Sequence, residues 1–140
     1  MSGILAPLLP FSGYLALLIR VLTGANLAIH GYPKLGKQGW QQSTGWMKSM
    51  GIPGVTAVLA GVLEFFGGLF LVVGLIVPIV ALFFAIQFFS IIIMKKAEMN
   101  AVYIGQNKPT YEIDVLYLML SIVILVLGAG AFSLDGLIGF

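Results

Sequence analysis

Four long apolar segments, separated by two polar loops and one short turn, dominate the pattern of hydrophobic and polar positions along the chain. A helix that crosses the hydrocarbon core needs about 20 predominantly apolar residues, because each residue adds only ~1.5 Å of rise. The segments 13–31, 53–73, 77–94 and 113–132 meet this requirement. Each must be helical, because lipid offers no hydrogen-bond partners to open backbone. The pattern therefore predicts an all-α integral membrane four-helix bundle, built as a single transmembrane domain over residues 1–140.

The second and third segments follow one another in one long apolar stretch, Ile52–Met94, which is too long for a single crossing. Gly74 can end a helix and Pro78 cannot continue one, so we predict a tight turn over 74–78. Tryptophan favours the headgroup layer, and both tryptophans of the chain lie in the loop before this stretch. We expect a short interfacial helix over Trp40–Met50.

Composition agrees with a membrane protein. The chain is 60% hydrophobic and only 9% charged, with a mean hydropathy of +1.09. A soluble domain carries about 25% charged residues, so the apolar excess here must face lipid. The net charge of +2 is too small and too dispersed for a surface that follows phosphates. We therefore predict the lipid bilayer as a partner and no nucleic-acid partner.

The distribution of lysine predicts the orientation of the bundle. All lysines lie in the two long loops, 32–52 and 95–112: Lys34, Lys37, Lys48, Lys95, Lys96 and Lys108. The termini and the middle turn contain none. With four crossings the two long loops share a side, and the positive-inside rule places that side in the cytoplasm. We predict a multi-pass protein of the cell membrane with both termini on the extracytoplasmic side.

Two charged residues lie inside the apolar segments. Arg20 is about seven residues into the first segment and Glu64 eleven residues into the second, which runs antiparallel. A lone charge at such a depth costs about 2.5–3.5 kcal/mol on insertion scales, so we expect the two to bond or to share a hydrogen-bond network. Gln87 of the third segment could add a hydrogen bond. Arg20, Glu64 and Gln87 form the candidate intramembrane site, and two interpretations stay open: a structural ion pair or a proton- or ligand-binding site.

A second group of polar residues is predicted at the cytoplasmic mouth. His30 and Lys34 are four residues apart and therefore share one face of the first helix. Tyr111 and Glu112 precede the fourth segment on the same side, followed by Asp114, and acidic residues suit a helix N-terminus. Histidine beside carboxylates can pass protons near neutral pH. The alternative is that these residues are interface anchors and a helix cap.

The sequence limits the redox chemistry of the chain itself. It has no cysteine, which excludes thiolate nucleophiles, zinc–thiolate sites and iron–sulfur ligation by this chain. His30 is its single histidine, so one subunit cannot supply two histidine ligands to a haem. We predict neither a metal site nor a covalently bound cofactor, and a quinone remains open as a non-covalent one.

The chain resembles the DoxX family over nearly its whole length. The motifs that carry the resemblance are Arg20-x3-Gly24-x5-His30-Gly31-x2-Lys34, then Gly51-Ile52-Pro53 with Glu64-x2-Gly67-Gly68 and Gly74, then Tyr111-Glu112, and finally Gly128-x-Gly130-x2-Ser133-Leu134-Asp135. The order and spacing of these motifs make the match specific. The resemblance implies a four-helix bundle and an association with oxidoreduction, since members of the wider group are tied to thiosulfate:quinone oxidoreductase or quinol oxidase subunits.

Three functions follow from the residues and the resemblance together. The first is a membrane subunit in quinone-linked oxidoreduction, with His30, Lys34, Tyr111 and Glu112 as donors and proton carriers and the second redox centre on a partner subunit. The second is a non-catalytic scaffold or assembly subunit that anchors a partner oxidoreductase at the membrane. The third is a carrier of protons or small solutes through the Arg20–Glu64 interior, which ranks last because no pair of broken helices is present. Small residues also recur at three- and four-residue spacing along the second segment: Ala57, Ala60, Gly61, Gly67 and Gly68. Such a stripe could pack helices within one bundle or pack further copies of the chain against one another.

Overall fold

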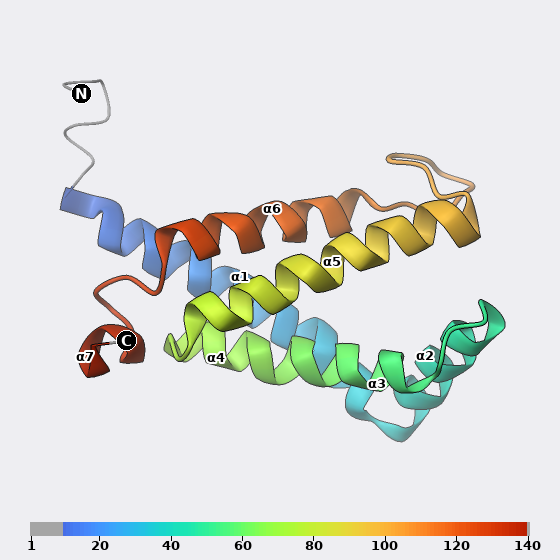
Figure 1. Cartoon of the computed structure of the whole chain (residues 1–140), viewed down its shortest axis with the longest axis horizontal. Helices are drawn as coiled ribbons and strands as arrows, with labels where there is room; N and C mark the ends of the chain where they lie inside the picture. Colours follow the sequence, from blue (N-terminus) through green and yellow to red (C-terminus); the bar gives the residue numbers. More distant parts are fainter. Residues whose placement is uncertain (1–9, 140) are drawn as a thin grey trace.

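The computed structural model describes residues 10–139, and in it four helical rods lie side by side in antiparallel order (Figure 1). The first rod is α1 (Ser12–Leu35). The second is one continuous helix made of α3 (Val55–Val62), the π-helical turn η2 (Leu63–Gly67) and α4 (Gly68–Val73). The third and fourth are α5 (Val77–Met99) and α6 (Glu112–Leu127). Two short helices lie outside the rods, α2 (Lys37–Ser49) and α7 (Leu134–Ile138).

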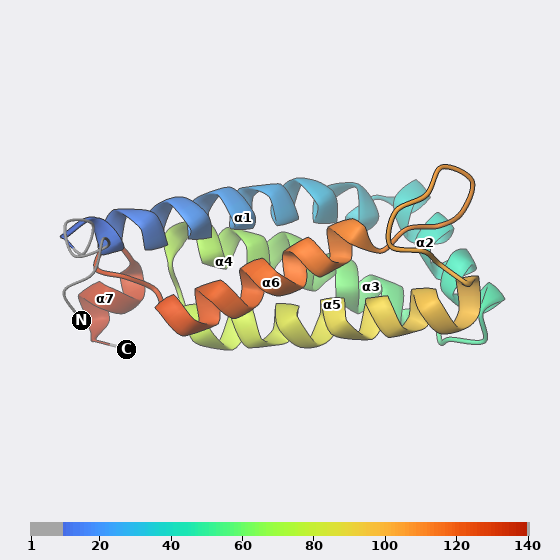
Figure 2. The same ribbon diagram turned by 90° about the horizontal axis from the view of Figure 1, so that it is seen from above.

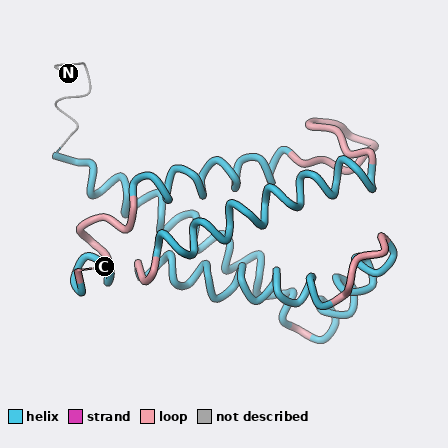
Figure 3. Tube along the Cα trace, viewed as in Figure 1, coloured by secondary structure: helices cyan, strands magenta, loops and turns pink. Residues whose placement is uncertain are grey.

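The connections gather at the two ends of the bundle (Figures 2 and 3). Helix α2 and the long loop over 100–111 lie at one end, which we call the lysine end because all six lysines lie at or beside it. The start of α1, the turn between α4 and α5, and α7 lie at the opposite end, which we call the terminal end. Polar loops and caps are thus separated from the apolar middle of the rods.

Apolar side chains fill the interior and also cover the outside of the bundle. The centre is formed by buried residues such as Leu27, Leu71, Phe84, Phe88 and Ile124. Large apolar side chains on every rod face outward, among them Leu22, Leu59, Phe83 and Val126. Three of the rods, Ser12–Leu35, Val55–Val73 and Val77–Met99, are long and apolar enough to cross a membrane. The chain is a multi-pass membrane protein with an all-α bundle.

Glycines set the distance between the first two rods. Gly24 of α1 meets Gly68 of α4, and a Cβ added to either would lie 2.5 Å from the carbonyl oxygen of the other. Only glycine permits such backbone contact between helices in a membrane. Further along, Gly31 faces the backbone of Glu64. These contacts fix which residues of α1 lie level with which residues of the second rod.

The observed helices differ from the predicted segments mainly at their ends. Helix α1 continues through Pro33 to Leu35, four residues beyond the predicted end at 31, and α5 runs to Met99 instead of 94. The fourth helix is shorter than predicted, because Gly128 (φ 70°, ψ −166°) ends α6 and the chain turns back through 128–133 into α7. The interfacial helix expected over Trp40–Met50 is present as α2, beginning three residues earlier.

Candidate functional site

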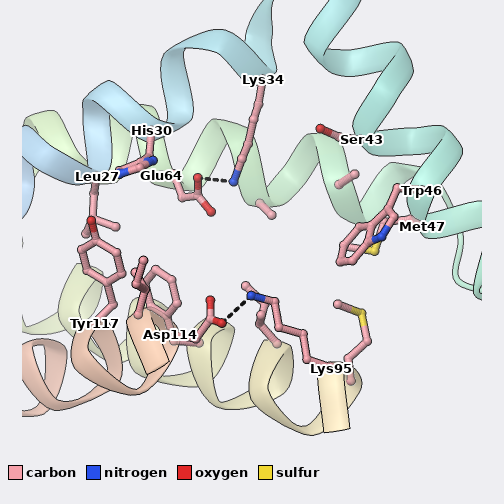
Figure 4. Close-up of a pocket in the computed structure, with 16 residues that line it drawn as sticks. Leu27, His30, Lys34, Ser43, Trp46, Met47, Glu64, Lys95, Asp114 and Tyr117 are labelled. Atoms are coloured by element: carbon pink, nitrogen blue, oxygen red, sulfur yellow. Dashed lines mark hydrogen bonds and ion pairs between the residues drawn. The ribbon is translucent and has the colours of Figure 1, made fainter. Parts of the chain in front are cut away.

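A cavity of about 300 Å³ opens between the helices near the lysine end (Figure 4). Helices α1, α2, α3, α5 and α6 and the π-helical turn all contribute to it. Its lining consists of apolar and aromatic side chains with a few charged groups: Leu27, His30, Lys34, Ser43, Trp46, Met47, Ala57, Ala60, Glu64, Phe88, Ile91, Met94, Lys95, Ile113, Asp114 and Tyr117. A mostly apolar hollow with a few convergent polar groups is the usual form of a small-molecule site.

The first charged pair of the cavity joins α1 to η2. Lys34 Nζ lies 2.5 Å from Glu64 Oε2. Glu64 is 3% exposed and sits within the π-helical turn, where one residue more than in an α-helix fits into the turn. Such turns re-aim a side chain and often occur at functional sites. Here the turn lies beside Gly31, whose missing side chain leaves room for the Glu64 backbone.

The second charged pair joins α5 to α6 on the facing wall of the cavity (Figure 4). Lys95 Nζ lies 2.5 Å from Asp114 Oδ2 and also donates a hydrogen bond to the carbonyl oxygen of Thr110 at 3.2 Å. Asp114 lies in the first turn of α6, where the helix N-terminus favours a negative charge. The four charges of the two pairs cancel, so the cavity as a whole is neutral when His30 is neutral.

Aromatic rings close the cavity at both of its sides. Tyr117 is buried, and its ring stacks on Phe88 with the ring centroids 5.0 Å apart. The rings of His30 and Tyr117 form an edge-on contact with their centroids 6.3 Å apart. At the opposite side, Trp46 and Met47 of α2 cover the hollow (Figure 4). The polar groups on two facing walls are therefore separated by apolar contact surface.

The structure divides the predicted intramembrane site. Gln87 Nε2 donates a hydrogen bond to Glu64 Oε1 at 3.0 Å, so these two residues are brought together. Arg20 is elsewhere, and the predicted contact between Arg20 and Glu64 was wrong. Glu64 lies level with Gly31, eleven residues along α1 from Arg20, which corresponds to about 16 Å of helix. Counting from helix ends failed because α1 is not flush with the second rod: its first turns extend beyond α4 and pack against Phe132.

Arg20 instead joins the helix ends that meet at the terminal end. It is 1% exposed, and its guanidinium donates to the carbonyl oxygens of Leu71 (2.8 Å), Val72 (3.2 Å) and Phe132 (2.6 Å). The first two carbonyls belong to the last turn of α4, which has no further helical partners to offer them. A positive charge is also favourable at a helix C-terminus. Arg20 thus caps α4 and ties it to the chain after α6.

Asp135 caps the N-terminus of α5, as Arg20 caps the C-terminus of α4. Its carboxylate accepts hydrogen bonds from the backbone N–H groups of Ile76 (2.6 Å) and Val77 (2.8 Å), the first donors of that helix. The turn between these caps needs Gly74, whose φ of 76° is left-handed and whose missing Cβ leaves room for the Arg20 guanidinium. Arg20 and Asp135, which lie close enough to attract each other, therefore clamp the tight turn from both sides. We call this set the terminal clamp.

The predicted mouth site is also divided. His30 and Lys34 line the cavity, whereas Tyr111 and Glu112 do not. Tyr111 is the N-cap residue of α6 and packs against Tyr103 and beneath Lys96, and Glu112 is exposed. Asp114, which the sequence placed in this group as an acidic residue at a helix N-terminus, does line the cavity. The other lining side chains Lys95, Tyr117 and Trp46 were not singled out for the site.

A signal for these missed residues exists in the sequence. Asp114 and Tyr117 are three residues apart and therefore share one face of α6. Lys95 ends an apolar run just as Lys34 does, and in both halves of the chain a lysine near the end of one helix pairs with a carboxylate on the next. This repeated arrangement, a lysine at a helix end followed by a carboxylate on the next rod, could have indicated Asp114 as the partner of Lys95.

Comparison with known proteins identifies the family of the chain. The family model described as DoxX matches residues 15–97, more than half of the chain. The chain belongs to the DoxX family. It is also 32% identical, over 119 residues, to the Bacillus subtilis (strain 168) protein named "Putative oxidoreductase CatD", a match that covers 85% of this chain and 83% of that protein. No solved structure matches the chain. The matched DoxX region contains Lys34, Glu64 and Lys95 but ends before Asp114.

Proposed function

We propose that this DoxX family chain is a membrane subunit in quinone-linked oxidoreduction and that its cavity binds the headgroup of a quinone or quinol. The observation that carries the proposal is the pair of lysine–carboxylate contacts on facing walls, Lys34–Glu64 and Lys95–Asp114. A quinone headgroup is a flat apolar ring with oxygen atoms at opposite ends. It therefore calls for hydrogen-bonding groups on two walls and apolar contact between them.

The balance of charge in the cavity favours a neutral ligand. Two lysines and two carboxylates cancel, so an inorganic anion would find no net attraction there. The volume of about 300 Å³ is at the lower limit of usual ligand pockets, which favours a single ring or a fused pair over a larger cofactor. The name of the Bacillus subtilis relative, "Putative oxidoreductase CatD", supports the same class of function.

The lysine ammonium groups would donate to the ligand oxygens, and the carboxylates would hold those ammonium groups in place. Bound quinone supplies a couple that takes up two electrons and two protons on reduction to quinol. The electrons would come from a partner oxidoreductase subunit, or return to it in the opposite direction. Phe88 and Tyr117 would pack on the ring and exclude water.

Fluorescence of Trp46 offers a direct test, because it lies in the cavity wall and the chain has only one other tryptophan. Trp40→Phe protein in lipid nanodiscs is titrated with menadione, and we expect saturable quenching. Replacing Lys95 by Met together with Asp114 by Leu removes one donor without stranding a buried carboxylate. We expect that change to weaken binding about tenfold, as the loss of one charge-assisted hydrogen bond predicts.

The matched control is Lys37→Met, which removes an exposed lysine of α2 outside the cavity and should leave the affinity unchanged. Quenching that does not saturate would refute the proposal. Equal affinity in the Lys95/Asp114 variant and in the control would refute it as well.

The alternative function is a scaffold that anchors a partner oxidoreductase. One observation favours it: Lys37, Lys48, Lys96 and Lys108 are all exposed at the lysine end, where they outnumber the exposed carboxylates Glu98 and Glu112. The positive-inside rule would put this end in the cytoplasm. Under this alternative, changing the four lysines to serine would release the oxidoreductase subunit from isolated membranes while substitutions in the cavity would not. If cavity substitutions alone abolish quinol turnover with the partner still bound, the scaffold role is insufficient.

A further inference from the structure

The side-chain amide of Gln87 has a hydrogen-bond partner for its nitrogen but not for its oxygen. Its nitrogen donates to Glu64 Oε1, while its own Oε1 is buried and has no hydrogen-bond partner within residues 10–139. Most buried polar atoms are paired, and an unpaired one calls for a specific reason. An amide presents a donor and an acceptor on opposite sides, so turning it by half a revolution exchanges them.

Glu64 is surrounded by groups that suit more than one protonation state. As a carboxylate it accepts from Lys34 on one oxygen and from Gln87 on the other. If it binds a proton, the Gln87 nitrogen no longer has an ideal acceptor, but the turned amide offers Oε1 to the new O–H group. Lys34 would then lose its counter-charge, which is tolerable because its side chain is 37% exposed.

Asp114 lacks such an arrangement. It is held by Lys95, which is itself fixed by the Thr110 carbonyl, and it lies at the positive end of α6. Nothing among the described contacts of Asp114 would accept a hydrogen bond from a protonated carboxyl.

We propose that Glu64 is the carboxyl group of the cavity that takes up and releases a proton, and that Gln87 serves both of its protonation states by turning its amide. The proton adds to one carboxylate oxygen and leaves from it again, and the ammonium group of Lys34 exchanges no proton in this step. The inference rests on the proposed function only for the identity of the ligand that exchanges this proton. The other titratable groups that line the cavity are Lys34 and His30 from α1, Lys95 from α5, and Asp114 and Tyr117 from α6.

Infrared spectroscopy of the ligand-free protein in lipid, recorded across a pH series, tests the assignment. We expect one carbonyl band of a protonated carboxylic acid, distinct from those of the exposed Glu98 and Glu112, to grow as the pH falls, to be lost in Glu64→Gln and to persist in Asp114→Asn. In Gln87→Leu the acid loses its hydrogen-bond acceptor, so the band should move to higher frequency. Gln41→Leu, which changes an exposed glutamine on α2, should leave it unmoved.

A second measurement needs no variant of Glu64 to fold. In protein labelled with ¹⁵N at glutamine, the side-chain amide signals of Gln87 are identified by their loss in Gln87→Leu. We expect them to shift with the same midpoint as the infrared band. A band that persists in Glu64→Gln, or Gln87 signals that do not change with pH, would overturn the inference.

These outcomes are separable from the test of quinone binding. Menadione quenching that fails while the Glu64 band behaves as expected would remove the proposed function and leave the proton-carrying role. Quenching that depends on Lys95, together with a band unaffected by Glu64→Gln, would leave the proposed function and remove the proton-carrying role of Glu64.

Discussion

Replacement of Arg20 by methionine should destabilise the bundle far more than any exposed substitution. Methionine retains most of the apolar stem but removes the donors to the carbonyl oxygens of Leu71, Val72 and Phe132. It also removes the positive charge that attracts Asp135. The end of α4, the chain after α6 and the start of α5 would lose their common attachment.

The size of the effect can be worked out from these contacts. Hydrogen bonds to a charged group contribute about 1.5–3 kcal/mol each, and three of them would give roughly 4.5–9 kcal/mol if they were additive. They are not, because carbonyls that lose the guanidinium can recover other partners, and the Nε of Arg20 is already buried without a partner among the described residues. Removing one partner of a buried charged network typically costs about 3–5 kcal/mol. Since whole proteins are stable by about 5–15 kcal/mol, this is a large fraction.

Unfolding of the helical signal by SDS in mixed micelles measures the free energy of unfolding. We expect Arg20→Met to lose about 3–5 kcal/mol, and Lys37→Met, the same substitution at an exposed site, to lose less than about 0.5 kcal/mol. A double-mutant cycle with Asp135→Asn should show coupling, because both residues hold one turn. An Arg20→Met protein as stable as the Lys37→Met control would refute this account of the terminal clamp.

Two further predictions concern packing and orientation. Gly68→Ala should cost about 1–3 kcal/mol in the same assay, because its Cβ would lie 2.5 Å from the Gly24 carbonyl oxygen, whereas Gly45→Ala on α2, with nothing within 4 Å, should be neutral or stabilising. Because the chain has no cysteine, single cysteines report sidedness cleanly. In intact cells, an impermeant thiol reagent should label Leu137→Cys at the terminal end and spare Lys37→Cys; the reverse pattern would overturn the predicted orientation.

The fold could be predicted from the sequence because its main determinants are local. The length and apolarity of each segment predict the helices, and Gly74 followed by Pro78 predicts the tight turn. The premature end of α6 was missed, although Gly128 was visible, because the residues around it are apolar and hydropathy alone does not distinguish a helix from an apolar loop. Pro33 had the opposite effect: it suggested an end where α1 continues.

The partners of the charged residues could not be predicted as easily, because they depend on how far one helix is shifted along another. That register is set by the contacts of Gly24 with Gly68 and of Gly31 with Glu64, which are long-range. The sequence identified Glu64 and Gln87 as interior polar residues, and the structure brings them together. It gave no indication of the π-helical turn, whose extra residue is an outcome of tertiary packing and leaves no pattern in hydropathy.

The two groups of charges in this bundle differ in what satisfies them, and that difference agrees with a structural role for the terminal clamp and with the proposed ligand-binding role for the cavity. Every described hydrogen bond of Arg20 ends on a backbone carbonyl, so its charge is used in holding helix ends together. Lys34 and Lys95 pair with carboxylates that line a mostly apolar cavity, and under the proposed function such pairs would re-form around a ligand. Folded protein recovered from Arg20→Lys should therefore bind menadione with unchanged affinity despite lower stability. The Lys95/Asp114 variant should lose affinity while retaining most of its stability, since a buried ion pair replaced as a unit by apolar residues is often neutral. If both variants lost stability and affinity in parallel, the separation between clamp and cavity would be wrong.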